Sequence, residues 1–410
     1  MARRRAVVIG GGIGGLAAAA GLNAAGWDVS LCERAPALEP VGAGLALAPN
    51  GLRALDVVGA GDAVRATATA VPQAPGIRRR DGRWLTRGPG TLIAERFGDP
   101  FTPVTRAAVI DALLARVPAA VLALSSTATS VEPGGTAARV MTTAGDLDAD
   151  LVVAADGIRS ATRAGLFPAH PGLRYAGFTT WRLLVGPLGR ADRAAGAAGE
   201  DGADGDVPLA ESWGRGTVFG VMPLAGGQVY CYAAAPADPG VRAGDELAGL
   251  VRLFGTWQPP IPGLLAITRP QDVLRHDVAE LAAPLPSFHR GRAALLGDAA
   301  HPIRPNLGQG ACQALEDAAV ISWLAAGTGP DAVTGMLARY TAARLPRTTD
   351  VVRWSRRAAT MTTWASPPAV AFRNTVARLT GRLAPGAALR GLAAIYGWQP
   401  PAAARPGDAG

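Results

Sequence analysis

The chain opens with an apolar run that leads into a glycine-rich turn, and this feature restricts its fold more than any other. Residues 6–9 read Ala-Val-Val-Ile, which suits a buried strand, and residues 10–15 read Gly-Gly-Gly-Ile-Gly-Gly. Gly10, Gly12 and Gly15 fit the spacing G-x-G-x-x-G, in which a tight turn joins a strand to a helix whose N-terminus faces a phosphate. The pattern therefore predicts a strand, a turn that includes Gly14, and a helix over residues 16–25.

A second predicted strand, over residues 27–33, ends in an acidic side chain. Glu33 follows Gly10 by 23 residues, a distance at which its carboxylate can accept hydrogen bonds from both hydroxyl groups of an adenosine ribose. Arg34 comes next and is placed to cover the adenine ring or the ribose edge; the alternative is an ordinary surface arginine. Together these features predict an ADP-binding turn, against the alternative of a glycine-rich joint without ligand. FAD and NAD(P) both carry ADP, so the turn alone does not separate them.

Another apolar run, residues 151–155, ends in Asp156-Gly157 and is followed by Arg159 and Arg163. Asp-Gly after a strand predicts a tight turn. Taken alone, the two arginines are equally consistent with a solvated basic face.

A third stretch joins a short apolar strand at residues 293–296 to a helix at residues 311–326. The connection contains Gly297-Asp298, the prolines 302 and 305, and Gly308-Gln309-Gly310. The prolines exclude regular pairing, and the glycines let the backbone approach a ligand where the helix begins. The free N–H groups and positive end of that helix favour an electron-rich group.

In this order, the three stretches resemble the single-component FAD-dependent aromatic hydroxylases, the class A flavoprotein monooxygenases. That family has an N-terminal dinucleotide turn, a central motif D-G-x-R-S-x-x-R and a later Gly-Asp motif. The resemblance extends to about Arg357 and is weakest over residues 174–274. Among the members, the urate- and salicylate-type hydroxylases are the most similar in motif.

The resemblance implies an α/β fold: a Rossmann-like FAD-binding domain of the glutathione-reductase type, with an inserted antiparallel-sheet substrate domain and C-terminal helices. We expect the FAD-binding domain at residues 1–172 and 275–365, the substrate domain at 173–274, and C-terminal helices and a frayed tail at 366–410. Within these, residues 41–47 are expected to form a loop along the flavin ring, and residues 190–208, rich in Gly, Ala and Asp, a mobile loop. A hairpin is predicted over 77–92 and helices over 51–58, 105–114, 245–254, 340–359 and 373–396.

The resemblance also implies which residues bind FAD. Arg106, at the start of a helix capped by Thr105, matches an arginine that reaches the ribityl and pyrophosphate region; a cation there opposes the helix dipole unless an anion is present. The backbone at Val131 is expected to contact adenine. The other cofactor residues implied by the motifs are Asp156, Gly297, Asp298, Pro305, Gly308, Gln309, Gly310, Ala311 and Cys312.

For the substrate, Trp181-Arg182 matches a Trp-Arg pair of the urate- and nicotinate-type hydroxylases, which implies that Arg182 orients an anionic or carbonyl-rich ring. The alternatives are a strand arginine on a solvated face and a core tryptophan. No protein acid or base is identified, and His301 is expected to make a structural hydrogen bond.

Composition excludes several other functions. The chain has 40 Lys+Arg residues, and all are arginine; without lysine there is no Walker A loop, no Schiff base and no halogenase lysine. The cysteines and histidines show neither C-x-x-C nor H-x-x-x-H spacing, so we expect no disulfide framework and no metal site. The formal net charge of +8 comes from dispersed arginines, so no nucleic-acid site is expected. Residues 6–27 are uncharged, but their glycines indicate a phosphate turn rather than a membrane span or signal peptide. We therefore expect a soluble cytoplasmic protein, a monomer or homodimer, without a membrane partner.

The expected reaction is the family's. NAD(P)H binds transiently and reduces FAD, O2 adds to give the flavin C4a-hydroperoxide in a dry pocket, and an oxygen atom is transferred to an electron-rich small molecule. Epoxidation, Baeyer–Villiger insertion and a non-oxygenating NAD(P)-linked flavin oxidoreductase remain open alternatives.

Overall fold

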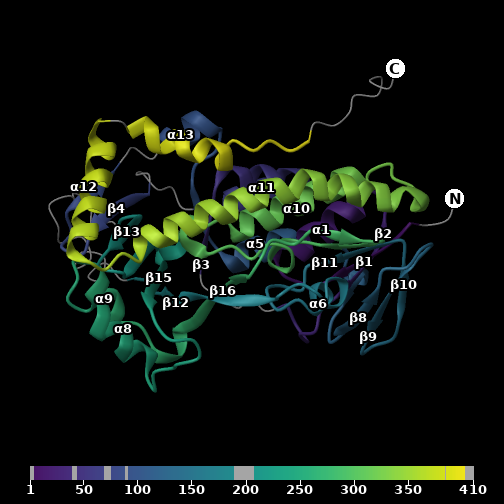
Figure 1. The fold of residues 1–410 in the computed structure, drawn as a ribbon, viewed down its shortest axis with the longest axis horizontal. Helices are drawn as coiled ribbons and strands as arrows, with labels where there is room; N and C mark the ends of the chain where they lie inside the picture. Colours follow the sequence, from purple (N-terminus) through teal and green to yellow (C-terminus); the bar gives the residue numbers. More distant parts are fainter. Residues whose placement is uncertain are drawn as a thin grey trace.

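The structure is a computed structural model that describes residues 4–38, 44–68, 75–87, 91–188, 207–383 and 385–401. Two sheets of six and seven strands dominate it. The long helix α11 (Val333–Thr362) runs over both parts, α12 (Pro367–Leu383) closes one end, and α13 (Pro385–Tyr396) turns back over the top (Figure 1). The one or two helices predicted over 373–396 are present as α12, which begins earlier than expected, and α13.

The six-stranded sheet carries the N-terminal motif. Its order is β17-β18-β11-β1-β2-β7, with β1 (Arg5–Ile9), β2 (Asp28–Cys32), β7 (Leu122–Ala123), β11 (Leu151–Ala154), β17 (His289–Arg290) and β18 (Ala293–Leu295). The strands β2, β1, β11 and β18 run parallel, and Ile9 pairs with both Ala154 and Cys32. Because neighbouring parallel strands end at one edge, the three motifs that follow β1, β11 and β18 meet there. The predicted strand–turn–helix at the N-terminus is confirmed.

Two helices cover one face of this sheet and pack closely through small residues. They are α1 (Ile13–Ala24) and α10 (Gly310–Ala325). A Cβ on Gly14 would lie 3.2 Å from that of Ala314, and a Cβ on Gly21 would overlap the hydroxyl of Ser322. The helices therefore approach at a distance that larger side chains exclude, and the N-termini of both point toward the edge where the motifs meet.

The seven-stranded sheet has the order β16-β12-β15-β14-β13-β4-β5. Its strands are β4 (Gly76–Arg79), β5 (Trp84–Thr86), β12 (Leu173–Val185), β13 (Ala210–Trp213), β14 (Val218–Pro223), β15 (Val229–Pro236) and β16 (Leu274–Leu281). One face is covered by α8 (Glu246–Phe254) and α9 (Ile261–Ala266), with a separate apolar core between them. The sheet thus takes β4, β5 and all but the first residue of β16 from outside residues 173–274, while the domain boundaries themselves stay a prediction.

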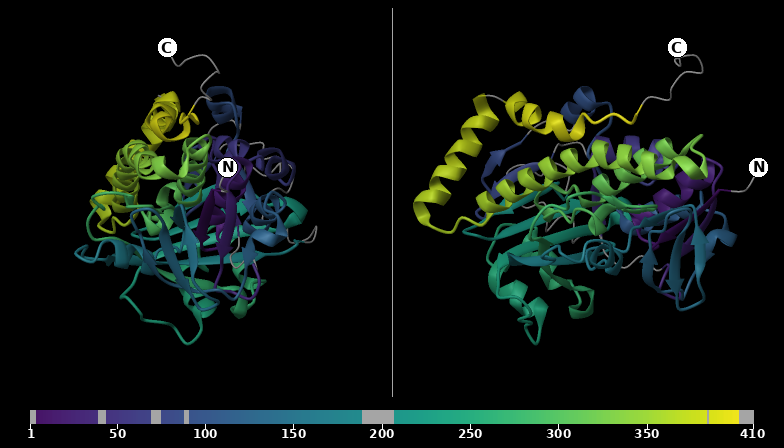
Figure 2. Two further views of the ribbon diagram at one scale, coloured as in Figure 1. Left: turned by 90° about the vertical axis from the view of Figure 1, so that its right-hand side faces the viewer. Right: turned by 45° about the vertical axis from the view of Figure 1, so that its right-hand side comes forward.

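The remaining elements connect these layers. They are β3 (Gly44–Leu47) paired with β6 (Thr102–Thr105), the three-stranded sheet of β8 (Ala128–Glu132), β9 (Ala138–Thr142) and β10 (Leu147–Ala149), and the helices α2 (Pro49–Val57), α3 (Gly61–Ala66), α4 (Thr91–Phe97), α5 (Arg106–Leu114) and α6 (Ala161–Leu166). Figure 2 shows the three-stranded sheet at the end of the molecule opposite α12.

Three local predictions need correction. Residues 44–47 form strand β3 rather than a loop, because antiparallel pairing with β6 satisfies their backbone groups; residues 41–43 lie outside the described ranges. The hairpin predicted over 77–92 is present as β4–β5, but its last residues, 91 and 92, begin helix α4. Helix α2 begins at Pro49, two residues before the predicted start at residue 51.

Two further expectations concern the loop at 190–208 and the uncharged residues 6–27. The loop expected at 190–208 falls almost wholly on residues 189–206, outside the described ranges, as does most of the tail. The uncharged residues 6–27 form β1, the glycine turn and α1. None of the helices that the structure describes is both long and apolar enough to cross a bilayer.

Candidate functional site

The glycine turn after β1 requires glycine at two positions, and at a third position it has free space around the backbone. Gly10 has φ +100°, and a Cβ there would lie 2.6 Å from the carbonyl oxygen of Ala155 on the neighbouring motif. A Cβ on Gly15 would overlap the carbonyl oxygen of Gly10. At Gly12, by contrast, no described atom lies within 4 Å of an added Cβ. The turn is thus tightly packed on the protein side and open on the side that faces away from the sheet.

Glu33 lies against this turn. Its Oε2 accepts a hydrogen bond from the backbone N–H of Gly11 at 2.6 Å, and its Oε1 accepts one from Ala35 at 2.9 Å. The carboxylate is half-buried, the neighbouring Arg34 is exposed, and Val131 on β8 is half-buried. The structure therefore brings Glu33 to the glycine turn, as its spacing predicts.

The Asp-Gly motif links the first motif to the third. One carboxylate oxygen of Asp156 accepts from the backbone N–H of Thr162 at 3.1 Å, while the other is enclosed and has no partner among the described residues. The guanidinium of Arg163 is buried and donates to the carbonyl oxygens of Ile158 at 2.6 Å and Ala299 at 3.0 Å. The solvated-face alternative is therefore wrong for Arg163, although it describes the exposed Arg159.

Behind the Gly-Asp loop lies a buried carboxylate. Gly297, with φ +60°, donates its N–H to Oδ2 of Asp317 at 2.9 Å, and Nε2 of His301 lies 2.5 Å from the same oxygen. Burial alone would raise the pKa of Asp317, but His301 and Arg344 lower it to about 2. The expected structural hydrogen bond of His301 is confirmed.

Arg344 on α11 completes this network, and no sequence motif singles it out. It is 1% exposed and donates to Asp317 and Glu316 at 2.5 Å each. Glu316 also accepts from Arg347 at 2.6 Å and from Asn50 at 2.7 Å. The available signal was the pair Glu316-Asp317 inside an apolar helix, because buried carboxylates need a paired cation.

The N-terminus of α10 is open to the same edge. Gly308 has φ +62°, and no described atom lies within 4 Å of a Cβ added at Gly308 or Gly310. Gln309 is fully buried and its Nε2 has no partner in the described chain. Pro305 is exposed and Ala311 half-buried. Cys312 is buried against Gly51 of α2, and burial raises the pKa of its thiol to about 12; its backbone N–H, and not its sulfur, therefore belongs to this helix terminus.

Asp298 marks a cleft between these parts. Its surface is exposed, yet it lies deep enough in the molecule that desolvation raises its pKa, an effect opposed by His301, Arg182, Arg106 and Arg163. A carboxyl group that is both accessible and surrounded by protein lines a cleft rather than a convex surface. Its side chain makes no hydrogen bond to any described residue. Asp298 thus lies with several cations around an accessible hollow.

Two of those cations lack partners of their own. Arg106 on α5 and Arg182 on β12 are half-buried, and neither guanidinium donates a hydrogen bond within the described ranges. Burial, and then the charge of Arg182, lower the pKa of Arg106, while Asp298 opposes both effects. Partly desolvated cations that repel each other favour a bound anion.

The sheet face that carries Arg182 also carries Glu211, an acidic residue that the sequence analysis did not identify. Arg182 pairs with Tyr232, Tyr232 with Gly220, and Gly220 with Glu211, so the four form one row across β12, β15, β14 and β13. Tyr232 donates to Glu211 at 2.7 Å, and Trp213 Nε1 donates to the same carboxyl group. Burial raises the pKa of Glu211, although these two donors lower it. This pairing between distant strands has no local sequence signal.

Trp181 is not part of this group. Alternation along β12 points it to the opposite face, where it is 7% exposed in the core under α8 and α9 and donates to Glu246 at 2.7 Å. The prediction that Trp181 contacts substrate is therefore corrected: Trp181 is a core residue.

The cleft fits an FAD molecule on three observations of this structure. The turn is open at Gly12, the terminus of α10 is open at Gly308 and Gly310, and Arg106 and Arg182, which donate to no described residue, are close enough to Asp298 to lower its pKa. An extended dinucleotide offers phosphates for the glycine turn, ribose hydroxyls for Glu33, and an electron-rich pyrimidine edge for the α10 terminus.

Comparison with known proteins agrees with this geometry. A family model described as "FAD binding domain" matches residues 3–184 and 217–355. The aurachin C monooxygenase/isomerase of Stigmatella aurantiaca is 35% identical over 91% of this chain and 93% of its own length. The FAD-dependent urate hydroxylase of Klebsiella pneumoniae is 32% identical over 86% and 89%. The 3-amino-4-hydroxybenzoate 2-monooxygenase of Streptomyces cremeus is 34% identical over 87% and 86%.

Solved structures show the same architecture. Klebsiella pneumoniae HpxO complexed with FAD and uric acid superposes with a TM-score of 0.83 at 29% identity, over 93% of this chain and 95% of that one. A salicylate hydroxylase substrate complex, with a TM-score of 0.76 at 23% identity over 98% and 99%, shares the fold. The chain therefore belongs to this FAD binding domain family and is an FAD-dependent monooxygenase of the aromatic hydroxylase type, with NAD(P)H and O2 as its co-substrates.

Proposed function

We propose that the protein hydroxylates an acidic aromatic ring whose anionic oxygen pairs with Arg182. The observation that carries the proposal is the half-buried guanidinium of Arg182, which donates to no described residue and lies in one row with Tyr232 and Glu211 on one sheet face. An aromatic hydroxylase requires an electron-rich ring, and an ionised or hydrogen-bonded oxygen on the ring supplies that electron density. The uric acid in the HpxO complex and the acid in the name of the Streptomyces relative belong to this chemical class.

The residues that would hold FAD are those that open onto the cleft. Gly10, Gly12, Gly14 and Gly15 would take the phosphates, Glu33 the ribose and Arg34 and Val131 the adenine side; the remaining contacts fall to Arg106, Asp156, Gly297, Asp298, Pro305, Gly308, Gln309, Gly310, Ala311 and the backbone of Cys312. Bound FAD supplies hydride acceptance and oxygen activation. The protein supplies position, charge and the exclusion of water.

Arg182 acts on the substrate in this proposal by charge. A guanidinium pairs with a carboxylate or phenolate through two parallel N–H donors, which fixes the plane of the ring as well as its position. Arg106, whose charge repels that of Arg182, disfavours the binding of a neutral or cationic ring in the same place. The site therefore selects an acid.

Tyr232 and Glu211 would take the proton of the substrate hydroxyl. Tyr232 already donates to Glu211 at 2.7 Å, so a proton accepted by the phenol oxygen of Tyr232 can pass to the carboxylate. Burial raises the pKa of Glu211, which brings a carboxyl group closer to the pH at which it exchanges protons. Deprotonation of the ring hydroxyl would make the carbon beside it more nucleophilic.

The test is NAD(P)H oxidation by the FAD-loaded protein with a panel of hydroxylated aromatic acids, their amides and their methyl ethers. We expect flavin reduction to accelerate with an acid and a product one oxygen atom heavier by mass spectrometry. Arg182→Gln raises KM for the acid by about 10–100-fold, the value of one charge-assisted pair, and leaves the amide unaffected. Preference for the amide, or an unchanged KM for the acid, would refute the role of Arg182.

A second outcome, epoxidation or Baeyer–Villiger insertion, is kept because the relative with 35% identity has a name that combines monooxygenase with isomerase. NMR of the product distinguishes a ring hydroxyl from an epoxide or an inserted ester oxygen. A lack of oxygen in any product would favour a non-oxygenating oxidoreductase.

We also propose a cytoplasmic monomer or homodimer. The reductant NAD(P)H is a cytoplasmic metabolite, and the cysteines 32, 231 and 312 are free and buried, as is usual in a reducing compartment. Light scattering of the FAD-loaded protein tests the mass against the tetramer described for 2-methyl-3-hydroxypyridine-5-carboxylic acid oxygenase.

A further inference from the structure

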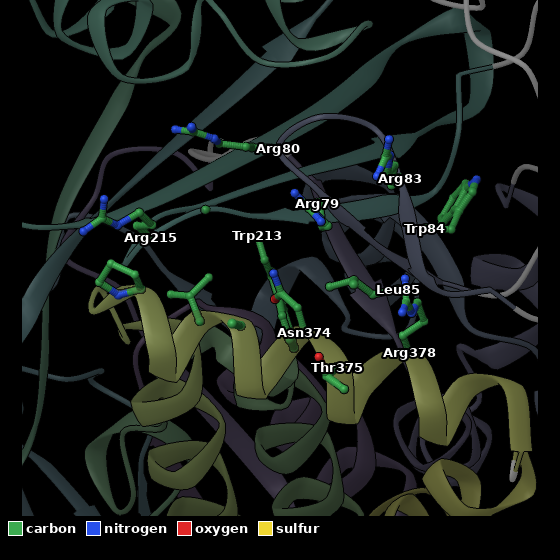
Figure 3. A pocket seen from close by; sticks show the side chains of 14 residues that line it. Arg79, Arg80, Arg83, Trp84, Leu85, Trp213, Arg215, Asn374, Thr375 and Arg378 are labelled. Carbon is green, nitrogen blue, oxygen red and sulfur yellow. The ribbon is translucent and has the colours of Figure 1, made fainter.

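A separate hollow lies at the far edge of the seven-stranded sheet. It is enclosed by the β4–β5 hairpin, the end of β13 and helix α12, and has a volume of about 440 Å³ (Figure 3). Three strands, β13, β14 and β15, separate β4 from β12, which carries Arg182. At a strand spacing of about 4.8 Å this places β4 about 19 Å from β12, and β13, whose Trp213 also lines the hollow, about 14 Å from it. The two sites are therefore distinct.

The lining of this hollow is strongly basic. Five arginines line it, Arg79, Arg80, Arg83, Arg215 and Arg378, and no acidic side chain does so within the described ranges. Arg79 pairs with Asp81 at 2.8 Å, and Arg215 donates to the carbonyl oxygen of Ala365. The side chains of Arg80, Arg83 and Arg378 make no hydrogen bond or ion pair with the part of the chain that the structure describes. Their charges are therefore available to an anionic ligand.

Two indoles give the same hollow an aromatic wall. Trp84 and Trp213 line it, together with the apolar side chains of Leu85, Val370 and Ala371. Figure 3 shows the arginines of the hairpin on one side and Asn374, Thr375 and Arg378 of α12 on the other. A concave site with apolar walls and a few convergent charges is typical of a small-molecule site. An inorganic ion alone would leave the aromatic wall unused.

The hollow is also connected to the proposed substrate site through one side chain. Trp213 lines the hollow, and its Nε1 donates to the buried carboxyl group of Glu211. On its other side, Arg373 of α12 lies over the Trp213 ring, 4.9 Å from the centroid, and donates to the carbonyl oxygen of Gly214 at 2.9 Å. A ligand that moves Trp213 therefore changes the surroundings of Glu211.

We propose that this hollow binds a planar organic anion, such as an aromatic carboxylate or a phosphorylated ring, between the hairpin arginines and α12. The anionic group pairs with Arg83 and Arg378, while Arg80 adds positive charge on the same hairpin. The ring lies against the edges of Trp84 and Trp213, since Arg78 lies over the Trp84 ring and Arg373 over the Trp213 ring. The ligand is either an acidic extension of the substrate or a separate small molecule. A bounded hollow of about 440 Å³ favours a compact ligand over a nucleic acid strand, which requires a continuous groove. The coupling to Glu211 rests on the proposed function, whereas binding itself does not.

Binding is tested on the FAD-loaded protein by calorimetry and tryptophan fluorescence with 2-naphthoate, its neutral amide and inorganic phosphate. We expect saturable binding of naphthoate, at least tenfold weaker binding of the amide, and weaker binding of phosphate. Arg80→Ala with Arg83→Ala should weaken naphthoate binding at least tenfold. Arg252→Ala, an exposed arginine on α8, is the matched control and should change nothing. Arg182→Gln removes the other anion site and should leave this binding intact.

Two results would overturn the proposal, and a third would overturn only the role of the ring. Equal binding of naphthoate to the double variant, or loss of binding with Arg182→Gln alone, overturns the proposal, and phosphate binding as tightly as naphthoate overturns the role of the ring. Circular dichroism and the flavin spectrum confirm that the variants are folded. If the double variant also raises KM for the hydroxylated substrate with kcat kept, the ligand is an extension of the substrate; if turnover is unchanged, it is a separate molecule. Naphthoate binding without any turnover would leave this site standing while the proposed function fails.

Discussion

Replacement of Arg344 by methionine tests whether the buried charges behind the Gly-Asp loop hold the site together. Breaking a fully buried ion pair costs about 3–5 kcal/mol of unfolding free energy, because the remaining charge has neither water nor a partner. Glu316 keeps Arg347 at 2.6 Å, so Asp317 is the carboxylate that loses its guanidinium, and it retains His301. We therefore expect a loss near the lower end, about 3 kcal/mol.

The pH dependence reports on the ionised state of Asp317, which His301 and Arg344 stabilise together. The pKa of Asp317 is lowered from 3.8 to about 2 by His301 and Arg344 against the effect of burial. A depressed carboxyl pKa contributes stability that is present above pH 3.8 and is lost as the pH falls through about 2. At 1.36 kcal/mol per pKa unit, this contribution is about 2.5 kcal/mol in total, of which the variant loses the share that belongs to Arg344. The difference between wild type and Arg344→Met should therefore be constant above pH 4 and shrink toward pH 2.

Urea unfolding followed by circular dichroism measures the loss of unfolding free energy. Flavin release on dilution measures the affinity of the site for FAD. Arg353→Met is the matched control on the same helix: it breaks an exposed pair with Asp350, worth about 0–1 kcal/mol. Asp317 also holds the N–H of Gly297, so we expect Arg344→Met to bind FAD more weakly, and Arg353→Met to bind it normally. A loss below about 1 kcal/mol in Arg344→Met, equal to the control, would refute the reasoning.

Three further changes have defined outcomes. Gly15→Ala places a Cβ onto the carbonyl oxygen of Gly10, so the purified protein should lack the visible flavin spectrum, whereas Gly335→Ala, with open space around it, should remain yellow. Arg106→Met removes an unpaired cation from the cleft and should raise the dissociation constant for FAD about tenfold, or about 1.4 kcal/mol, as measured by flavin fluorescence. Glu211→Gln removes a carboxyl group whose pKa is raised by burial. Since a raised acid pKa costs stability above the unfolded value, this variant should be more stable than wild type at pH 8 and equal to it at pH 4, by thermal unfolding.

The parts of the site that were predictable are those written in contiguous residues. The turn at Gly10–Gly15, Glu33 after the second strand and Asp298 after the third follow from strand–turn–helix chemistry within a few residues. Parallel pairing of β1 with β11, and of β11 with β18, then brings them to one edge. That convergence depends only on each motif following a strand of the same sheet.

The substrate face could not be predicted in the same way. Glu211 and Arg182 lie in one row only because β14 and β15 separate their strands in the sheet, and strand order has no local signal. The two-residue period of β12 did carry usable information, since adjacent residues of a strand point to opposite faces. Because of this period, Trp181 and Arg182 cannot both face the substrate. The sequence therefore supports a substrate contact for only one of the two residues.

Arg344 was hidden for a different reason. The α11 segment is rich in arginine, and sequence alone does not distinguish a fully buried arginine from the exposed Arg353 on the same helix. The buried acids Glu316 and Asp317 on α10 demanded a cation, but its position depends on how α11 packs against α10. Such pairing is a property of the assembled helices.

The distribution of paired and unpaired charges is the strongest physical argument for where the ligand binds. Behind the Gly-Asp loop every charge is paired: Arg163 holds the carbonyl oxygen of Ala299, and Asp317 holds the N–H of Gly297 and the guanidinium of Arg344. On the cleft side, the side chains of Asp298, Arg106 and Arg182 make no hydrogen bonds with the described residues. The fully buried charges are satisfied by the protein itself. The charges beside the open glycine turn are left to water, so the fold is stable while water fills the cleft. It gains further when a ligand with phosphates, hydroxyls and an electron-rich ring replaces the water.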